Sequence, residues 1–206
     1  MPNALIAPLA VVLAYLLGSI PFAVVCSHLF GLADPRSYGS KNPGATNVLR
    51  SGNKAAAIAT LLGDMAKGWL AVFLAQEYAA QHGYGQVFVG LVALAVFFGH
   101  LYPVFLKFKG GKGVATAAGV LLAIDFRLGL ATLATWLLIS FALRYSSLAA
   151  LLAAAAAPFY AFLLWGSDTM LMVVGVIAIA LIGRHWKNLQ RLMAGTEPKI
   201  GAGKKA

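Results

Sequence analysis

Long apolar runs separated by short polar stretches dominate the chain. Seven low-charge segments follow one another, at residues 3–28, 55–76, 87–106, 114–124, 128–143, 148–165 and 170–183. A helix needs about 20 residues, and about 17 at the least, to cross the hydrocarbon core of a bilayer. The pattern therefore predicts an all-α polytopic membrane protein with about seven transmembrane helices, two of them short.

The two short segments are 114–124 and 128–143. They are consistent with two tilted spans or with one re-entrant pair. In either case the chain enters the membrane and returns, so the loops that flank the pair lie on the same side. In the first segment, Pro21 predicts a kinked helix.

Composition favours a membrane protein over a soluble one. The 206 residues are 61% hydrophobic and 11% charged, whereas soluble domains are about half apolar and a quarter charged. A soluble core of this length could not bury so much apolar surface. Because no soluble domain, internal repeat or low-complexity linker stands out, residues 1–206 are expected to form a single integral-membrane domain.

Positive charge is concentrated in every second loop, that is, in loops that lie on the same side of the membrane. The net charge is +10, and 14 of the 16 Lys and Arg residues lie in 29–54, in 107–113, at Arg144 and in 184–206. The opposite loops hold only Arg127, together with acidic residues. Because cytoplasmic loops carry the excess of Lys and Arg, we expect the N-terminus outside and the C-terminus in the cytoplasm.

The first basic loop combines glycines with phosphate-type donors. From Gly39 to Thr46 its spacing is that of a nucleotide P-loop, but Ala45 stands where the lysine belongs and no strand precedes it, so we reject that motif. Gly39 and Gly44 still allow successive N–H groups to form a nest for anionic oxygens. Additional donors are available from Ser40, Thr46, Asn47 and Arg50. The alternative is a polar turn whose Lys and Arg residues only set the orientation of the chain in the membrane.

A second glycine-rich motif begins the helix expected at 114–124. Gly110, Gly111 and Gly113 surround Lys112 there. A helix N-terminus with free N–H groups and a nearby cation is an anion site. The alternative is a flexible basic loop attracted to anionic lipid head groups. We favour anion binding, because three glycines around one lysine are costly for anchoring alone.

Two smaller polar clusters occupy loops of the same parity, at 144–147 and 184–188. On a continuing helix, His185 and Asn188 share a face. Each cluster alone is as consistent with a structural role as with a functional one. In the structural role, Arg184 and Lys187 would snorkel to the interface and Trp186 would belong to an aromatic belt.

The polar residues favour positioning and electrostatic catalysis. No zinc-type Cys/His spacing or paired carboxylates for Mg²⁺ appear, so no metal site is expected. A Ser-His-Asp triad of Ser147, His185 and either Asp34 or Asp64 has no supporting local motif and is disfavoured.

The second segment contains two charges within its apolar stretch. Asp64 and Lys67 lie at i, i+3, which predicts an intramembrane pair. Ionisable residues at such depth are functional candidates, although a structural tie between helices is the favoured role. For His100 we favour a hydrogen-bonded position between helices over a catalytic one.

Taken together, the motifs extend over nearly the whole chain. They occupy residues 18–22, 39–50, 64–68, 99–103, 109–116, 144–148 and 184–188. In this order they resemble the acyl-phosphate-dependent glycerol-3-phosphate acyltransferase family of bacteria, and the two glycine-rich motifs are highly specific together.

This resemblance implies a seven-helix enzyme of the bacterial cytoplasmic (inner) membrane, with its active site at the cytoplasmic face. It implies transfer of a fatty acyl group from acyl phosphate to the 1-hydroxyl of glycerol 3-phosphate. The products would be lysophosphatidic acid and phosphate, in the first step of phospholipid synthesis. No cofactor or general base is implied, and substrate phosphate would assist proton transfer. The expected partners are the two substrates and membrane lipids, with no nucleic acid.

The resemblance also assigns the site. By the family's pattern the acyl-phosphate head would be held by Ser40, Asn42, Gly44 and Thr46. Glycerol 3-phosphate would be held and oriented by Arg50, Lys112, Ser147, His185 and Asn188. Our catalytic candidates are Lys112, Ser147, His185 and Asn188, and our substrate-binding candidates are Ser40, Asn42, Gly44, Thr46, Asn47, Arg50, Gly110, Gly111, Lys112 and Arg144. Lys41 stands where glycine is common, which leaves the geometry of that turn open.

Two rival functions are less favoured. Acyl-CoA-dependent acyltransferases need an H-x-x-x-x-D motif, and no histidine here has Asp at that spacing. A membrane transporter for an organic phosphate would use Asp64 and Lys67 together with the basic loops. Transporters usually show inverted repeats and a midplane site, and we find neither in the sequence.

Overall fold

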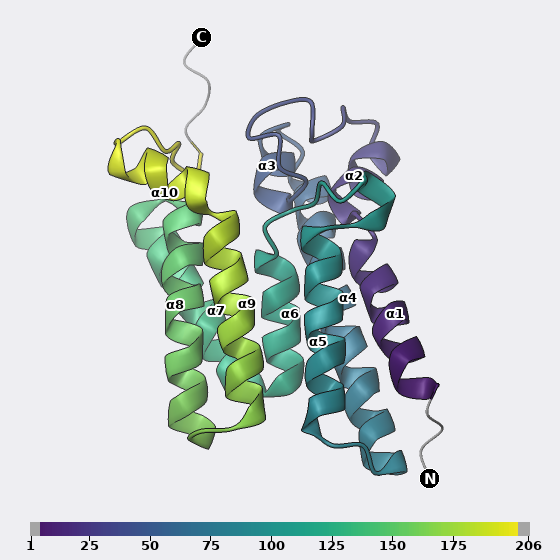
Figure 1. The fold of residues 1–206 in the computed structure, drawn as a ribbon. Helices are drawn as coiled ribbons and strands as arrows, with labels where there is room; N and C mark the ends of the chain where they lie inside the picture. The colour runs from purple at the N-terminus through teal and green to yellow at the C-terminus, as the bar shows by residue number, and fades with distance from the viewer. Residues whose placement is uncertain (1–4, 202–206) are drawn as a thin grey trace. The chain divides into compact units, whose positions relative to one another are not determined.

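The computed structural model describes residues 5–201, and every regular element within that range is helical (Figure 1). Residues 3 and 4 of the first predicted segment, and the tail charges Lys204 and Lys205, lie outside the described residues. In chain order the elements are α1 Ile6–Ser19, α2 Phe22–Leu29, α3 Ala45–Leu49, α4 Lys54–His82, α5 Gln86–Leu101, the 3₁₀ helix η1 Val104–Leu106, α6 Val114–Ile124, α7 Phe126–Leu143, α8 Ser146–Trp165, α9 Thr169–Arg184 and α10 Trp186–Met193.

The helices gather in two compact units, which divide between Asp125 and Phe126. The first unit contains α1 to α6 and both glycine-rich loops, and the second contains α7 to α10 and the tail. A single domain over 1–206 stays a prediction.

Four helices are long and apolar enough to cross a membrane, namely α4, α7, α8 and α5 extended through η1. The number rises to six if each of two bent pairs, α1 with α2 and α9 with α10, forms one span; both counts cover residues 5–201. Helix α6 is apolar but has only 11 residues. The count of seven spans and the orientation of the termini stay predictions.

Helix α7 is longer than the sequence predicts. The fifth apolar segment was expected at 128–143, whereas α7 has 18 residues because Phe126 and Arg127 form its first turn. The charge of Arg127 interrupts the apolar pattern without interrupting the helix. This segment therefore reaches spanning length, and its expected shortness was wrong.

The kink predicted at Pro21 is confirmed as a break between two helices. Helix α1 ends at Ser19, α2 begins at Phe22, and the two meet at 44°. Ile20 is extended there, as expected for a residue before proline. Because of the break, the Ile20 carbonyl does not take part in the regular helical hydrogen bonding.

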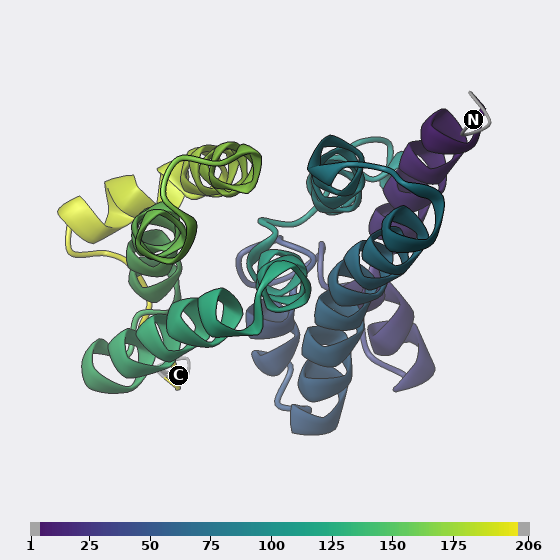
Figure 2. The same cartoon turned by 90° about the horizontal axis from the view of Figure 1, so that it is seen from below.

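Small residues bring helices of the first unit into backbone contact. A Cβ at Gly68 of α4 would collide with the Thr116 carbonyl of α6, and a Cβ at Gly119 would collide with the Met65 carbonyl. Figure 2 shows these two helices side by side. At Gly99, α5 packs equally closely against α1. Such contacts need glycine, so they hold each pair in one register.

In the second unit, α8 packs against both α7 and α9. Its buried positions are mostly alanine, namely Ala149, Ala150, Ala153, Ala154, Ala157 and Ala161. Helix α10 leaves α9 at 57°.

Candidate functional site

Asn47 organises the first glycine-rich loop. Its amide oxygen accepts a 2.9 Å hydrogen bond from the Ser40 backbone N–H, and its amide nitrogen donates to the carbonyls of Pro35 (2.6 Å) and Tyr38 (3.3 Å). The side chain is only 2% exposed. Asn47, a predicted substrate donor, therefore braces the loop in this conformation, and it engages the Ser40 N–H that the predicted anion nest would use.

The turn beside Asn47 requires left-handed backbone. Gly39 has φ +57°, and a Cβ there would collide with the Asn47 amide oxygen. Lys41 has φ +55°, a conformation that costs a non-glycine residue roughly 1–2 kcal/mol. The turn at Lys41 thus has the geometry for which glycine is suited, which answers the question that the sequence left open.

The other predicted donors of this loop are more accessible. Ser40, Thr46 and Arg50 are exposed, and Asn42 is half-buried. Thr46 lies in α3, a five-residue helix that begins directly after Gly44 and that the sequence did not predict. The base of this segment is anchored in a small core formed by Val48, Ala23, Ala56 and Ala57.

The second glycine-rich loop lies against the end of α5. The Gly111 backbone N–H donates a 3.1 Å hydrogen bond to the His100 carbonyl. A Cβ at Gly110 would overlap that carbonyl, and a Cβ at Gly111 would overlap the His100 imidazole. Gly113, with φ +86°, leads into α6 at the predicted place. Lys112 is half-buried between them.

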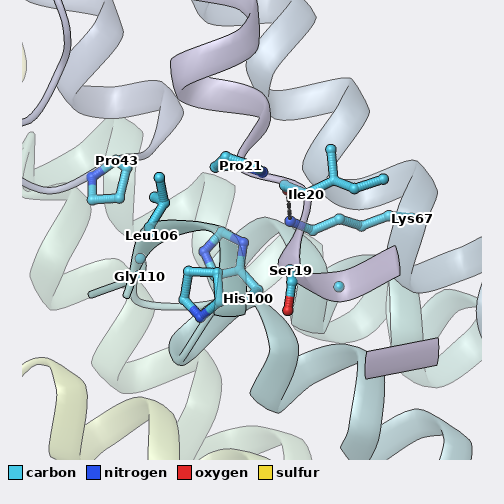
Figure 3. A pocket seen from close by; sticks show the side chains of 11 residues that line it. Ser19, Ile20, Pro21, Pro43, Lys67, His100, Leu106 and Gly110 are labelled. Atoms are coloured by element: carbon cyan, nitrogen blue, oxygen red, sulfur yellow. Dashed lines mark hydrogen bonds between the residues drawn. The ribbon is translucent and has the colours of Figure 1, made fainter. Parts of the chain in front are cut away.

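Both loops contribute to the lining of one small, partly open pocket of the first unit (Figure 3). Pro43 comes from the first loop, and Gly110 and Gly111 come from the second. The remaining lining residues are Gly18, Ser19, Ile20, Pro21, Lys67, His100, Pro103 and Leu106. The structure thus brings the two predicted anion-binding segments to the same pocket.

Beside this pocket, the predicted pair of Asp64 and Lys67 is confirmed. Their carboxylate and ammonium lie 2.7 Å apart, and both side chains are almost fully buried. The Lys67 ammonium also donates to the Ile20 carbonyl at 2.7 Å, the interaction marked in Figure 3. Nδ1 of His100 lies 3.4 Å from the same Asp64 oxygen, so the expected interhelical His100 contact is confirmed as well.

In the second unit, the Glu197 carboxylate accepts hydrogen bonds from three side chains. It accepts hydrogen bonds from Ser147 Oγ (2.6 Å), Asn188 Nδ2 (2.6 Å) and Arg191 Nε (2.7 Å). Burial by itself raises the pKa of Glu197, but these hydrogen bonds and the charge of Arg191 outweigh that effect and hold the pKa below its usual value. Two predicted site residues, Ser147 and Asn188, are therefore held by one anion.

Glu197 was not among the predicted site residues. The available signal was an acidic side chain in a strongly basic tail, in a chain with only six Asp and Glu. Its contact with Ser147 also bears on the disfavoured triad. A hydroxyl has one proton, and because Ser147 donates it to Glu197, Ser147 has none left to give to a histidine base in this conformation.

The tail folds back onto the turn before α8. The Ile200 N–H donates to the Arg144 carbonyl (2.6 Å), and Arg144 Nη2 donates to the Ile200 carbonyl (2.9 Å). The Lys199 ammonium lies 5.5 Å from the centre of the Tyr145 ring. Arg144, a predicted substrate contact, thus has part of its guanidinium engaged by the tail.

His185 lies at the bend between α9 and α10. Its Nδ1 donates to the Leu181 carbonyl (2.9 Å), since a carbonyl can only accept, and its own carbonyl accepts from the Asn188 N–H (2.8 Å). The helix does not continue through His185, because α9 ends at Arg184 and α10 begins at Trp186 with a 57° bend between them, so His185 lies at the bend and Asn188 in α10. Both side chains are nevertheless buried.

The predicted site residues thus form one group in each unit. Ser40, Asn42, Gly44, Thr46, Asn47, Arg50, Gly110, Gly111 and Lys112 belong to the first unit, and Arg144, Ser147, His185 and Asn188 belong to the second. Within residues 5–201, no three His, Cys, Asp or Glu side chains gather closely enough to hold a metal ion.

Comparison with known proteins gives consistent matches over most of the chain. The family model described as glycerol-3-phosphate acyltransferase matches residues 8–195. A glycerol-3-phosphate acyltransferase of Dechloromonas aromatica is 65% identical over 198 residues, which cover 96% of this chain and 98% of that protein. One from Ralstonia nicotianae is 62% identical over 194 residues, with 94% of each chain covered.

Two crystal structures resemble the fold. Both are of PlsY (YgiH), an integral membrane glycerol 3-phosphate acyltransferase. The glycerol 3-phosphate form has a TM-score of 0.88 and 38% identity, and covers 95% of this chain and 96% of that one. The lysophosphatidic acid form has a TM-score of 0.86 and 37% identity, with 95% of each chain covered.

Proposed function

The chain belongs to the glycerol-3-phosphate acyltransferase family, and from that premise we propose that it transfers a fatty acyl group from acyl phosphate to the 1-hydroxyl of glycerol 3-phosphate. The products are lysophosphatidic acid and phosphate, which makes this the first step of phospholipid synthesis. The observation that carries the proposal is that Pro43 of the first glycine-rich loop and Gly110 and Gly111 of the second line one pocket of the first unit.

The protein is a multi-pass bacterial membrane protein. We place it in the inner membrane, with seven spans, the N-terminus outside and the catalytic loops on the cytoplasmic side. The concentration of Lys and Arg in loops of one parity supports this orientation.

In the first unit, we assign the acyl-phosphate head to Ser40, Asn42, Gly44 and Thr46. The exposure of Ser40 and Thr46 beside the start of α3 supports this assignment. Asn47 holds the loop in shape rather than contacting substrate directly, because its amide already serves Ser40 and Pro35.

We assign neutralisation of the glycerol 3-phosphate dianion to Arg50 and Lys112. Guanidinium and ammonium groups form charge-assisted hydrogen bonds to phosphate, and Gly110 and Gly111 bring backbone close to the pocket. In the second unit, we propose Ser147, His185 and Asn188 as substrate-orienting residues, and Arg144 lies on the turn before α8.

The chemistry needs positioning more than activation. The 1-hydroxyl oxygen attacks the acyl carbonyl carbon, the bond from that carbon to the phosphate oxygen breaks, and the hydroxyl proton passes to the departing phosphate. Acyl phosphate is a mixed anhydride with a good leaving group. The protein's task is therefore to neutralise two phosphates and to bring the reacting atoms within about 3–3.5 Å. This mechanism uses no metal, cofactor or protein general base.

Transport of an organic phosphate is less well supported. A transporter would need Asp64 and Lys67 at an accessible midplane site. Their side chains are 3% and 1% exposed and are bonded to each other, with Lys67 also bound to Ile20.

The decisive assay uses purified protein in detergent. We expect lysophosphatidic acid to form from palmitoyl phosphate and glycerol 3-phosphate, and not from palmitoyl-CoA. Inactivity with fully dissolved palmitoyl phosphate would contradict the proposal. Counterflow of labelled glycerol 3-phosphate in proteoliposomes would favour a transporter instead.

A further inference from the structure

A cluster of three ionisable side chains lies buried beneath the two glycine-rich loops. It consists of Asp64 and Lys67 from α4 and His100 from the end of α5. The Asp64 carboxylate lies 2.7 Å from the Lys67 ammonium and 3.4 Å from Nδ1 of His100. The proposed chemistry does not use any of the three.

One arm of this cluster reaches the break between α1 and α2. The Lys67 ammonium donates to the Ile20 carbonyl and lies 5.7 Å from the centre of the Phe22 ring. Pro21 interrupts the helix there, so the Ile20 carbonyl needs a donor from elsewhere. Lys67 therefore fixes the break against α4.

The other arm reaches the loop that carries Lys112. The His100 ring occupies the space into which a Cβ at Gly111 would project, and the His100 carbonyl accepts the Gly111 N–H. On its other side, Nδ1 of the ring lies 3.4 Å from the Asp64 carboxylate. A chain of contacts thus runs from Asp64 through His100 to Gly111, one residue before Lys112.

Lys67 is unsuited to holding substrate phosphate itself. Its side chain is 1% exposed, and its ammonium already has a carboxylate and a carbonyl as partners. A tie between α4 and α5 alone does not require three buried ionisable groups, since burying charge is expensive unless every charge is paired. The contact between the His100 ring and Gly111 suggests a second role for the cluster, namely to hold the glycine-rich loop.

We propose that Asp64, Lys67 and His100 are positioning residues, which hold the glycine-rich loop through the contact between the His100 ring and Gly111 and so place Lys112. The inference rests on the proposed role of Lys112 in neutralising substrate phosphate. It is therefore tested first by a measurement that does not depend on activity.

That measurement is hydrogen–deuterium exchange of the full chain in detergent, followed on a peptide covering 107–116. In Asp64→Asn we expect the Gly111 amide to exchange about five- to tenfold faster, the change expected when roughly one hydrogen bond is weakened. Glu77→Gln removes one carboxylate charge from an exposed position of the same helix and should leave the exchange unchanged. If the Asp64→Asn variant does not fold, the double variant Asp64→Asn/Lys67→Met, which contains no unpaired buried ammonium, takes its place.

A double-mutant cycle tests the contact itself. Gly111→Ala places a methyl group against the ring, and His100→Ala removes the ring. We expect the loss of kcat/KM caused by Gly111→Ala to be at least about tenfold smaller in the His100→Ala background, because residues in contact are not additive. Additive losses, or unchanged exchange in the Asp64 variants, would overturn the proposal. Faster exchange with unchanged acyl transfer would instead support the positioning of the loop and contradict the role of Lys112.

Discussion

Asn188 donates a 2.6 Å hydrogen bond from its amide nitrogen to the carboxylate of Glu197, nine residues further along the chain. The same carboxylate oxygen accepts from Ser147 at the start of α8. One acidic side chain therefore sets the orientation of two residues assigned to substrate.

Replacing Glu197 should loosen this arrangement. Glu197→Ala removes an acceptor from two neutral donors and from Arg191, and hydrogen bonds to charged groups contribute roughly 1.5–3 kcal/mol each. We expect a lower melting temperature and faster hydrogen exchange over 186–200. Glu77→Gln, at an exposed position, is the control, and equal melting temperatures for the two variants would contradict the structural role of Glu197.

The low pKa of Glu197 predicts a pH dependence of stability. Because the pKa is lowered in the folded protein, the ionised carboxylate stabilises the fold fully above the unfolded-state pKa. That contribution is lost as the pH falls through the lower, folded-state pKa. The melting temperature of the wild type should therefore fall more steeply on acidification than that of Glu197→Gln. Parallel curves for the two proteins would show that the carboxylate does not contribute.

Arg50 and Lys112 should matter for binding glycerol 3-phosphate. We expect Arg50→Ala and Lys112→Ala each to lower kcat/KM roughly 10- to 150-fold, the kinetic equivalent of about 1.5–3 kcal/mol for a lost charge-assisted contact. Lys109→Ala removes an exposed charge from the same loop as Lys112 and should have little effect. Wild-type kinetics in both test variants would remove these residues from the site.

His185→Ala separates binding from proton handling. The mechanism passes the hydroxyl proton to the departing phosphate, so we expect the KM for glycerol 3-phosphate to rise while kcat recovers at saturation. Steady-state kinetics over a wide substrate range provide the measurement. A kcat that stays low at saturation would indicate that His185 takes part in proton transfer.

Lys41 offers a test of backbone strain. Its φ of +55° suits glycine, so Lys41→Gly should relieve about 1 kcal/mol of backbone strain. The greater conformational entropy that glycine gives the unfolded chain offsets part of this gain in stability. Lys41→Val, which is β-branched, should lower stability in the same melting experiment. The opposite order would contradict the left-handed turn.

Apolar periodicity predicted the helices well because each long segment carries its own signal. The break at Pro21 and the pairing of Asp64 with Lys67 were predictable for the same reason, since proline chemistry and i, i+3 spacing are local. Helix α3 was missed because five residues carry no measurable period. The start of α7 was misplaced because a terminal charge resembles a loop.

The site depends more strongly on contacts that sequence spacing does not encode. Ser147 and Glu197 are 50 residues apart, and Lys67 is 47 residues from Ile20. The bracing role of Asn47 was hidden for a different reason, since an amide suits substrate binding and loop closure equally. The residue types predicted that these segments bind anions. Only the fold shows which of their donors are already hydrogen-bonded within the protein.

The close contact of α4 and α6 at Gly68 and Gly119 also bears on how the protein responds to its lipid environment. An 11-residue helix is only about 16 Å long, roughly half the thickness of the hydrocarbon core. Its own hydrophobic length therefore does not set its depth, and α6 takes its depth from α4. We therefore expect Lys112 to keep its position relative to Asp64 in bilayers of different thickness.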